Sequence, residues 1–300
     1  MIATDTSELL PPSLMAKLER MEIASRKVFR GRMKGERRST RKGQSVEFAD
    51  FRGYVPGDDL RMIDWNLYAR LDQLFLKLFQ EEEDLHLNIL IDTSGSMRFS
   101  HPTKLRVASQ IAASLGYVGL CRNDRVRVAG LGRSGHRAPV LRGRASTVRM
   151  IQYLRTLEDV EAGVESATLA DSVKDFLVRD SSPGIVVVIT DLMDKTGYEA
   201  ALRMLIGRRM DVFVVHVLSP EELDPPIRGD LRLVDSEDGD TTEITLNAFV
   251  LKRYRETVQS FIDGARQFCS RRAITYFMTR SDLPIETIVT DYLQKRGMIR

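Results

Sequence analysis

Residues 86–300 alternate between two kinds of hydrophobic pattern, and this alternation limits the fold more than any other feature of the chain. Short apolar runs predict buried strands, whereas apolar residues that recur every three or four positions predict amphipathic helices. Strands separated by helices form βαβ units, so the sequence predicts an α/β fold with a doubly wound, mostly parallel sheet and helices on both faces. The expected strands are 87–91, 125–129, 138–141, 185–190, 212–218 and 274–278, and the expected helices are 104–120, 148–157, 169–178, 198–206, 248–268 and 285–293.

Residues 1–85 do not share this alternation. A loose apolar face over residues 13–29 predicts a helix, which Ser13 could cap at its start. Turn signals that contain glycine and proline predict irregular structure over residues 31–73. An alternating run at 74–79 then predicts a single strand before the α/β pattern begins.

We therefore expect two parts in the chain. Residues 1–85 form an N-terminal extension with a basic helix, and residues 86–300 form the α/β domain. Within the domain, the dipeptide Asp238-Gly239 lies between two alternating runs, which is a strong signal for a hairpin. A hairpin insertion is therefore expected at about residues 221–247.

The composition is that of a globular chain, with 43% hydrophobic and 29% charged residues. The longest uninterrupted apolar run covers only residues 185–189, far fewer than the roughly 18 residues of a membrane span. The N-terminus shows no secretory signal. Cys121 and Cys269 lie far apart without a CxxC motif, which argues against a disulfide scaffold or a cysteine zinc site. These features together predict a cytoplasmic protein.

The net charge of +3 conceals a basic N-terminus, because residues 1–45 contain 11 Lys or Arg and 5 Asp or Glu. Such a segment could bind nucleic acid. However, Phe29 is the only aromatic residue there that could stack on bases, and charge alone does not read a base sequence. A solvated surface or a contact with a partner protein is the favoured interpretation of residues 26–42.

Polar residues follow two of the predicted buried strands. Asp92, Ser94 and Ser96 follow the strand at 87–91, and Asp191 follows the strand at 185–190. Parallel strands bring such residues to one edge of the sheet, where Thr168 could add another hydroxyl. Carboxylate and hydroxyl oxygens suit a hard cation such as Mg²⁺ or Mn²⁺. The alternative is that these residues only cap helices and form turns.

The pattern Asp92-x-Ser94-x-Ser96, with Thr168 and Asp191 downstream, resembles the metal-ion-dependent adhesion site of von Willebrand factor A domains. The resemblance implies that Ser94, Ser96 and Thr168 contact Mg²⁺. It also implies that Asp92 and Asp191 hold the ion directly or through water. One coordination position would stay open for a carboxylate from a partner protein.

A second resemblance lies upstream, in residues 52–65 with the sequence RGYVPGDDLRMIDW. This segment is similar to the signature of bacterial proteins in the domain-of-unknown-function 58 family, in which a von Willebrand A-like domain follows directly. Residues 221–226 and 229–235 look similar as well. Family members often occur with MoxR-type AAA+ ATPases, so the resemblance implies an adaptor or co-chaperone of such an ATPase. Many members carry N-terminal membrane helices, which we do not expect here.

The signature has two interpretations, a structural one and a partner-binding one. Its acidic and basic residues are interleaved, so they could form ion pairs that brace a loop, with Trp65 anchored in the core. We favour this structural role over direct contact with a partner. The candidate residues of this signature loop are Arg52, Tyr54, Pro56, Gly57, Asp58, Asp59, Arg61, Asp64 and Trp65.

Three functions are compatible with these patterns. The first is a non-enzymatic module that binds a partner carboxylate through Mg²⁺. The second is a Mg²⁺-dependent phosphoryl or ester hydrolase that uses Asp92 or Asp191, with His101 the only histidine close to the motif in sequence. The third is nucleic-acid binding through the basic segment. We favour the first, and we expect His216, within an apolar strand, to be a core histidine.

Overall fold

The computed structural model describes residues 9–23, 47–80, 85–132, 139–159, 167–179, 184–227, 229–234, 240–295 and 297–299. Contacts between residues divide the chain into two compact units. The larger unit comprises residues 1–26 and 85–300, and the smaller unit comprises residues 27–84.

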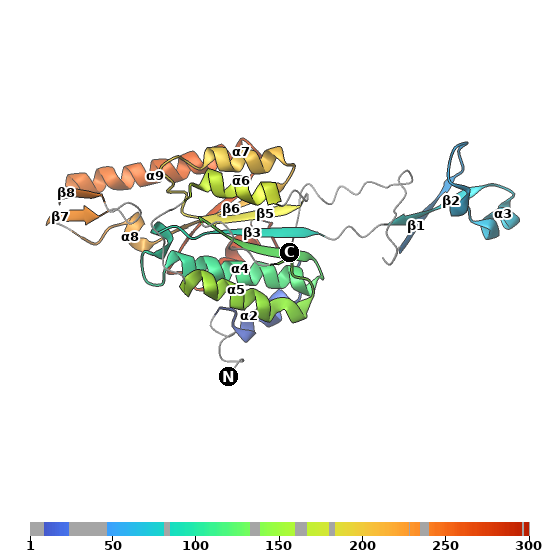
Figure 1. The fold of residues 1–300 in the computed structure, drawn as a ribbon, viewed down its shortest axis with the longest axis horizontal. Helices are drawn as coiled ribbons and strands as arrows, with labels where there is room; N and C mark the ends of the chain where they lie inside the picture. The colour runs from blue at the N-terminus through green and yellow to red at the C-terminus, as the bar shows by residue number, and fades with distance from the viewer. Residues whose placement is uncertain are drawn as a thin grey trace. The chain divides into compact units, whose positions relative to one another are not determined.

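The larger unit is built on a five-stranded sheet with the strand order β4-β3-β5-β6-β9, in which all neighbouring strands are parallel (Figure 1). This sheet confirms the predicted α/β fold. Its strands are β3 (His86–Asp92), β4 (Arg125–Leu131), β5 (Ile185–Thr190), β6 (Asp211–Leu218) and β9 (Thr275–Arg280).

Helices cover both faces of the sheet, with α6, α7 and α9 on one face and α4 and α5 on the other (Figure 1). Asn247 caps α9, because its side chain accepts a hydrogen bond from the backbone N–H of Val250 at 3.0 Å. Within the described segments, every helix is too short or too polar to serve as a membrane span. The helices are α2 (Pro12–Leu18), α4 (Lys104–Cys121), α5 (Thr147–Asp159), α6 (Leu169–Arg179), α7 (Glu199–Gly207), α8 (Pro220–Leu223), α9 (Ala248–Ser270) and α10 (Ile285–Thr287), which continues as the π-helix η4 (Ile288–Leu293).

The central strands are mostly apolar because helices cover them on both sides. Every residue of β5 and β6 is buried. Helix α4 is also buried on nearly all sides, and small residues make this possible. A Cβ atom at Gly116 would meet the Sδ of Met150, so the side chain of Met150 on α5 packs where a larger residue on α4 would displace it.

The strand order reverses between β3 and β5. After β3 the chain moves outward to β4, and it then returns to form β5 on the opposite side of β3. In such a sheet, the connections after the two central strands diverge and leave a crevice at the carboxyl ends, which is where ligands bind. Asp92 is the last residue of β3, and Asp191 directly follows β5. Both predicted carboxylates therefore lie at the reversal point.

The predicted hairpin is present as β7 (Gly229–Val234) paired antiparallel with β8 (Thr241–Leu246). The expected turn at Asp238-Gly239 lies outside the described residues. The strand expected at 138–141 is reduced to a single bridge between Leu141 and Val126. Pro139 has no N–H for a strand ladder, which fits this short pairing.

The helix expected at residues 13–29 is shorter than predicted. Helix α2 begins at Pro12, so Ser13 is not its cap, and it ends at Leu18. Ile23 then pairs with Ile299 near the other end of the chain, which requires extended backbone in place of helix. Residues 24–29 lie outside the described part of the chain.

Helix α2 packs on the larger unit rather than with the rest of the expected N-terminal extension. Leu14 and Leu18 are fully buried. Glu19 accepts a hydrogen bond from the hydroxyl of Tyr117 at 2.8 Å and pairs with Arg144 at 2.5 Å. Apolar burial and a shared carboxylate thus join the start of the chain to the α4 side of the sheet.

The smaller unit is more regular than the sequence suggested. The expected strand at 74–79 is present as β2 (Phe75–Gln80), but residues 31–73 are not all irregular. They include β1 (Glu47–Gly53), paired antiparallel with β2, and α3 (Trp65–Leu71). The prediction failed because β1 contains an irregularity between Phe48 and Asp50 and because α3 has only 7 residues.

Replacement of Leu14 by alanine should lower the free energy of unfolding by about 2–5 kcal/mol, because it leaves a cavity under α2. The control is Val178→Ala on the exposed surface of α6, which should change stability by no more than about 0.5 kcal/mol. Urea unfolding followed by circular dichroism measures both. Equal effects would contradict the packing of α2 on the larger unit.

Candidate metal centre

Two hydrogen bonds hold the carboxylate of Asp92 at the end of β3. Its Oδ1 accepts from the backbone N–H of Ser94 at 3.0 Å, and its Oδ2 accepts from the hydroxyl of Thr190 at 2.6 Å. Thr190 is the last residue of β5, so the neighbouring strand orients this side chain. The hydroxyl of Thr190 also accepts from the N–H of Leu192 at 3.0 Å, which links Asp92 to the loop after β5.

The hydroxyls of Ser94 and Ser96 lie side by side, with their Oγ atoms 3.1 Å apart. Between β3 and α4, the chain forms the short 3₁₀ helix η2 (Ser96–Arg98), and the fully buried side chain of Met97 anchors it. The hydroxyl of Thr93 turns away from this pair and donates to the carbonyl of Leu131 on β4. The motif therefore presents alternate polar side chains on one side of the loop.

Asp191 is held as firmly as Asp92 but is more deeply buried, with 1% of its surface exposed. Its Oδ1 accepts from the backbone N–H of Met193 at 3.0 Å. Its Oδ2 accepts from the Nζ of Lys104 at 2.7 Å. Leu192, between these anchored residues, has a φ of 59°, an uncommon value for a bulky side chain, so the loop conformation is locally strained.

The two carboxylates are close enough to affect each other. Burial raises the pKa of Asp92, and the negative charge of Asp191 raises it further. The hydrogen bonds from Thr190 and Ser94 act in the opposite direction without cancelling these effects. A cation beside both carboxylates would remove the repulsion, so the electrostatics of this edge favour a bound positive charge.

The donor atoms at this edge fit Mg²⁺ or Mn²⁺. Asp92, Asp191, Ser94 and Ser96 offer only oxygen, the ligand that hard cations prefer. Among the described residues, no group of three or more His, Cys, Asp or Glu side chains could hold a metal by itself. Hydroxyls and water would therefore complete the shell, and Mg²⁺ commonly binds in this way through one or two carboxylates.

Thr168 is the one predicted ligand whose contacts lie elsewhere. Its hydroxyl donates to Asp171 Oδ2 at 2.8 Å and accepts from the Asp171 N–H at 3.1 Å, so it caps α6. Its neighbour Leu169 donates to Asp194 Oδ2 at 2.5 Å, and this bond ties the start of α6 to the loop after β5. A role for Thr168 as a ligand stays a prediction.

Three residues that sequence reasoning missed complete the surroundings: Thr190, Lys104 and Glu222. Lys104 contacts Glu222 as well as Asp191. Glu222 belongs to a capping box at α8, in which its N–H donates to Ser219 Oγ at 3.2 Å and its Oε2 accepts from the Ser219 N–H at 2.8 Å. The Ser-x-x-Glu spacing could have predicted this cap, but no local pattern could have predicted its contact with Lys104.

The nearby histidines do not supply a general base for hydrolysis. His216 is buried, as expected for a core histidine, and its Nδ1 lies 2.7 Å from the hydroxyl of Tyr276. Burial lowers the pKa of His216 to about 4, although the charge of Asp191 opposes the shift. His101 is exposed, and no hydrogen bond in the described part of the chain joins it to Asp92 or Asp191.

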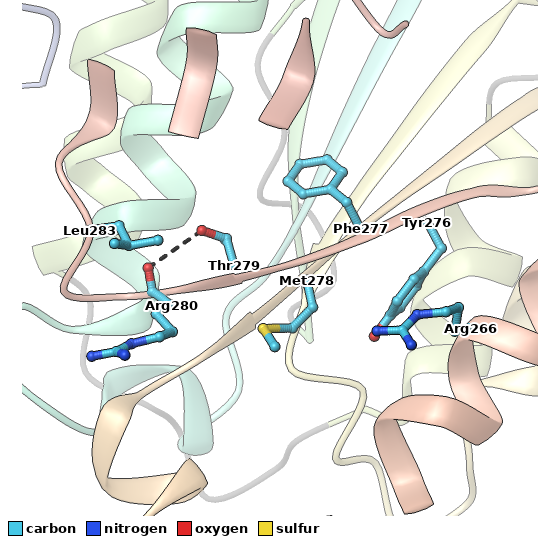
Figure 2. A pocket seen from close by; sticks show the side chains of 7 residues that line it. All are labelled: Arg266, Tyr276, Phe277, Met278, Thr279, Arg280 and Leu283. Carbon is cyan, nitrogen blue, oxygen red and sulfur yellow. Dashed lines mark hydrogen bonds between the residues drawn. The ribbon is translucent and has the colours of Figure 1, made fainter. Parts of the chain in front are cut away.

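A separate hollow of about 260 Å³ lies along the edge strand β9 (Figure 2), and its lining includes neither Asp92 nor Asp191. Its charged side chains are both arginines, and each has an acidic neighbour: Arg266 pairs with Asp263 at 2.8 Å and Arg280 with Asp282 at 2.6 Å. Among the described residues, no carboxylate, histidine or cysteine lines it. The lining residues are Arg266, Tyr276, Phe277, Met278, Thr279, Arg280 and Leu283.

The ion pairs predicted for the signature loop are present in part. Arg52 pairs with Asp58 at 2.9 Å, and Arg61 pairs with Asp59 at 3.4 Å. A backbone hydrogen bond from Val55 lowers the pKa of Asp58. These contacts support a bracing role for the charges of this loop.

Asp64 forms its ion pair outside the signature loop, with Lys77 of β2 at 3.1 Å. Its side chain also caps α3. The N–H of Tyr54 extends the β1–β2 ladder by donating to Leu74 at 2.9 Å. Pro56 and Gly57 form the following turn, in which the φ of 107° at Gly57 requires glycine.

The prediction that Trp65 anchors the core is wrong, since 60% of its surface is exposed. It is the first residue of α3 and points outward, with its ring edge-to-face with Tyr68 at 6.1 Å between centroids. Ile63 and Leu76 are buried instead and bridge to each other. We predicted a core position for Trp65 because large aromatic side chains are usually buried. Its place at the start of the short helix α3 instead directs the side chain outward.

Comparison with known proteins identifies one matching family model, described as "Protein of unknown function DUF58", which covers residues 50–261. The uncharacterised protein Rv1480 of Mycobacterium tuberculosis is 26% identical over 239 residues, which are 79% of this chain and 75% of that protein. The uncharacterised protein MAV169 of Mycobacterium avium is 27% identical over 156 residues, which are 52% of this chain and 85% of that protein.

Solved structures show lower similarity. BatB from Bacteroides thetaiotaomicron is 17% identical with a TM-score of 0.43, over 71% of this chain and 98% of that one. A von Willebrand factor type A protein from Catenulispora acidiphila is 12% identical with a TM-score of 0.39, over 74% of this chain and 43% of that one.

In metal-free buffer at about pH 8, Asp92→Asn should be more stable than the wild type, because it removes the repulsion between two buried carboxylates. The raised pKa of Asp92 means that the folded wild type takes up a proton as the pH falls, so this advantage should shrink towards about pH 5. Thermal melts with EDTA measure the difference. Asp175→Asn, on the exposed surface of α6, is the control, and a difference that does not change with pH would contradict the electrostatics described here.

Proposed function

This chain belongs to the DUF58 family, and we propose that it is a non-enzymatic interaction module that binds a carboxylate of a partner protein through Mg²⁺ or Mn²⁺. One observation carries the proposal: the carboxylates of Asp92 and Asp191 lie close enough to interact where the strand order reverses, and the hydroxyls of Ser94 and Ser96 lie 3.1 Å apart in the loop that follows Asp92. The proposed site therefore has the charge and the oxygen donors that a hard divalent cation requires.

The chain's own residues would hold the cation in a fixed arrangement. Ser94 and Ser96 would offer their hydroxyl oxygens, while Asp92 and Asp191 would bind directly or through water, with Thr168 as the further predicted ligand. Hydrogen bonds already orient both carboxylates, so little rearrangement would be needed. When bound, the metal would supply a positive charge with a coordination position open to a partner carboxylate.

The surroundings of the site suit a protein partner better than a small substrate. Phe99 follows the motif and is 51% exposed, and Met193 follows Asp191 and is 37% exposed. Apolar side chains beside a charged site would give a partner contact area and exclude water around the ion. Neither nearby histidine is placed to act as a general base, which favours binding over hydrolysis.

The resemblance to the family suggests which partner to test. We propose that the chain acts in the cytoplasm as an adaptor or co-chaperone of a MoxR-type AAA+ ATPase and binds the ATPase or its protein substrate. Nucleic-acid binding through residues 26–42 is the less favoured function, and that segment lies outside the described residues.

Addition of millimolar Mg²⁺ should raise the melting temperature of the wild type by several degrees, because the ion binds the folded state alone. Asp92→Ala should abolish the shift. Thr168→Val should reduce it if the predicted ligand role is correct, and should leave it unchanged if Thr168 only caps α6. A Mg²⁺ shift of equal size in Asp92→Ala would contradict the proposed metal site.

Binding to the MoxR-type ATPase encoded nearest to this gene should weaken by about tenfold or more in EDTA and in Ser96→Ala, since each removes part of the ion's coordination. Biolayer interferometry with Mg²⁺ measures the affinity. Thr257→Ala, a hydroxyl deletion on the exposed surface of α9, should bind like the wild type. Phosphatase or esterase activity that disappears in Asp191→Asn would overturn the non-enzymatic assignment.

A further inference from the structure

Lys104 is a fully buried lysine next to the proposed metal site. It is the first residue of α4, and 0% of its surface is exposed. Lysine is almost never buried to this extent unless it is paired. Its Nζ donates to Asp191 Oδ2 at 2.7 Å and contacts a carboxylate oxygen of Glu222. The ammonium group therefore lies between two acidic side chains from different parts of the fold.

Glu222 is held in place independently of Lys104. The capping box with Ser219 fixes its other carboxylate oxygen, and its backbone carbonyl accepts from the hydroxyl of Tyr254 at 2.7 Å. Ser219 is fully buried. The adjacent Glu221 turns to Ser100 instead, at 2.9 Å. Helix α8 thus presents one fixed carboxylate to Lys104.

The formal charges of this cluster match the charge of one divalent cation. Asp92, Asp191 and Glu222 contribute three negative charges, and Lys104 contributes one positive charge. The net charge of minus two would become minus three without the lysine, and it would become minus one without Glu222. Charges in a partly desolvated cluster interact strongly, so such changes have large effects on the affinity for an ion.

We propose that Lys104 is a built-in counter-ion that sets how tightly the site binds a divalent cation. Its ammonium offsets the charge of Asp191 when no ion is bound, and it opposes the charge of the ion when one is bound. Glu222 holds the lysine in this position. This inference rests on the proposed metal site, which it extends from the ligands to a residue that controls affinity.

The alternative is that Lys104 only positions Asp191. The two roles predict opposite results when the lysine is removed, because a counter-ion weakens metal binding whereas a positioning residue strengthens it. A substitution of Glu222 shows whether the net charge of the cluster or the position of Asp191 controls metal binding, because it changes the charge in the opposite direction. The full chain and three variants therefore form a charge series: Lys104→Met, Glu222→Gln and the double variant.

Isothermal titration with Mn²⁺ alone measures the affinity of each protein. We expect Lys104→Met to bind Mn²⁺ about tenfold or more tightly than the wild type, and Glu222→Gln to bind it more weakly by a similar factor. The double variant has the same net charge as the wild type and should bind within about threefold of it. Lys174→Met, on the exposed surface of α6, should leave the affinity unchanged.

Each outcome separates this inference from the proposed function. Weaker binding by both Lys104→Met and the double variant, while the wild type binds Mn²⁺, would overturn the counter-ion role and leave the metal site intact. Binding by Lys104→Met alone would support the counter-ion role and overturn metal dependence in the wild type. Binding by none of the proteins would overturn both.

Removal of the lysine leaves the carboxylates of Asp191 and Glu222 without their partner and could prevent folding. Circular dichroism therefore checks whether Lys104→Met is folded. If this variant does not fold, Glu222→Gln decides the question alone. An affinity equal to or higher than that of the wild type would then overturn the inference, and a weaker affinity would support it.

Discussion

The candidate site depends on one constraint, the reversal of strand order between β3 and β5. Because the chain leaves β3 towards β4 and returns to form β5 on the other side, the loops that follow these strands diverge. Asp92 and Asp191 can therefore share one edge of the sheet. The apolar strands below, which helices cover on both faces, fix the register of Ile91 beside Ile189 and hence the relative height of the two carboxylates.

This arrangement places the negative charges of Asp92 and Asp191 close together, and only one of the two carboxylates has a positively charged partner among the described residues. Asp191 has the ammonium of Lys104 as a partner, whereas the donors to Asp92 among the described residues are neutral, namely the hydroxyl of Thr190 and the N–H of Ser94. The pKa of Asp92 therefore remains raised, and its ionised form is the unsatisfied charge of the site. Hydrogen bonds position this carboxylate but do not neutralise it, which is the condition under which a cation gains most from binding.

Periodicity predicted the larger unit well because its central strands are buried on both faces and most of its helices on one face. The hydrophobic pattern of each such element therefore reflects its surroundings. It failed where contacts distant in sequence decide the backbone. Pairing of Ile23 with Ile299 ends the helix that the apolar spacing extended to residue 29. In the smaller unit, β1 and α3 are too short or too irregular to show a period, and Trp65 lies on the outer side of a helix that local pattern could not orient.

The sequence by itself determined that Asp92 and Asp191 would each lie at the carboxyl end of a buried strand, and that Ser94 and Ser96 would follow Asp92 at alternate positions. These are local properties, since the spacing within a strand and its turn decides which side chains point the same way. Only the tertiary structure decided that the two strands are neighbours and that Lys104 and Glu222, 118 residues apart, meet beside Asp191. The charge of Lys104 can be buried because distant segments supply Asp191 and Glu222 as its partners, and a local sequence pattern cannot predict such a long-range contact.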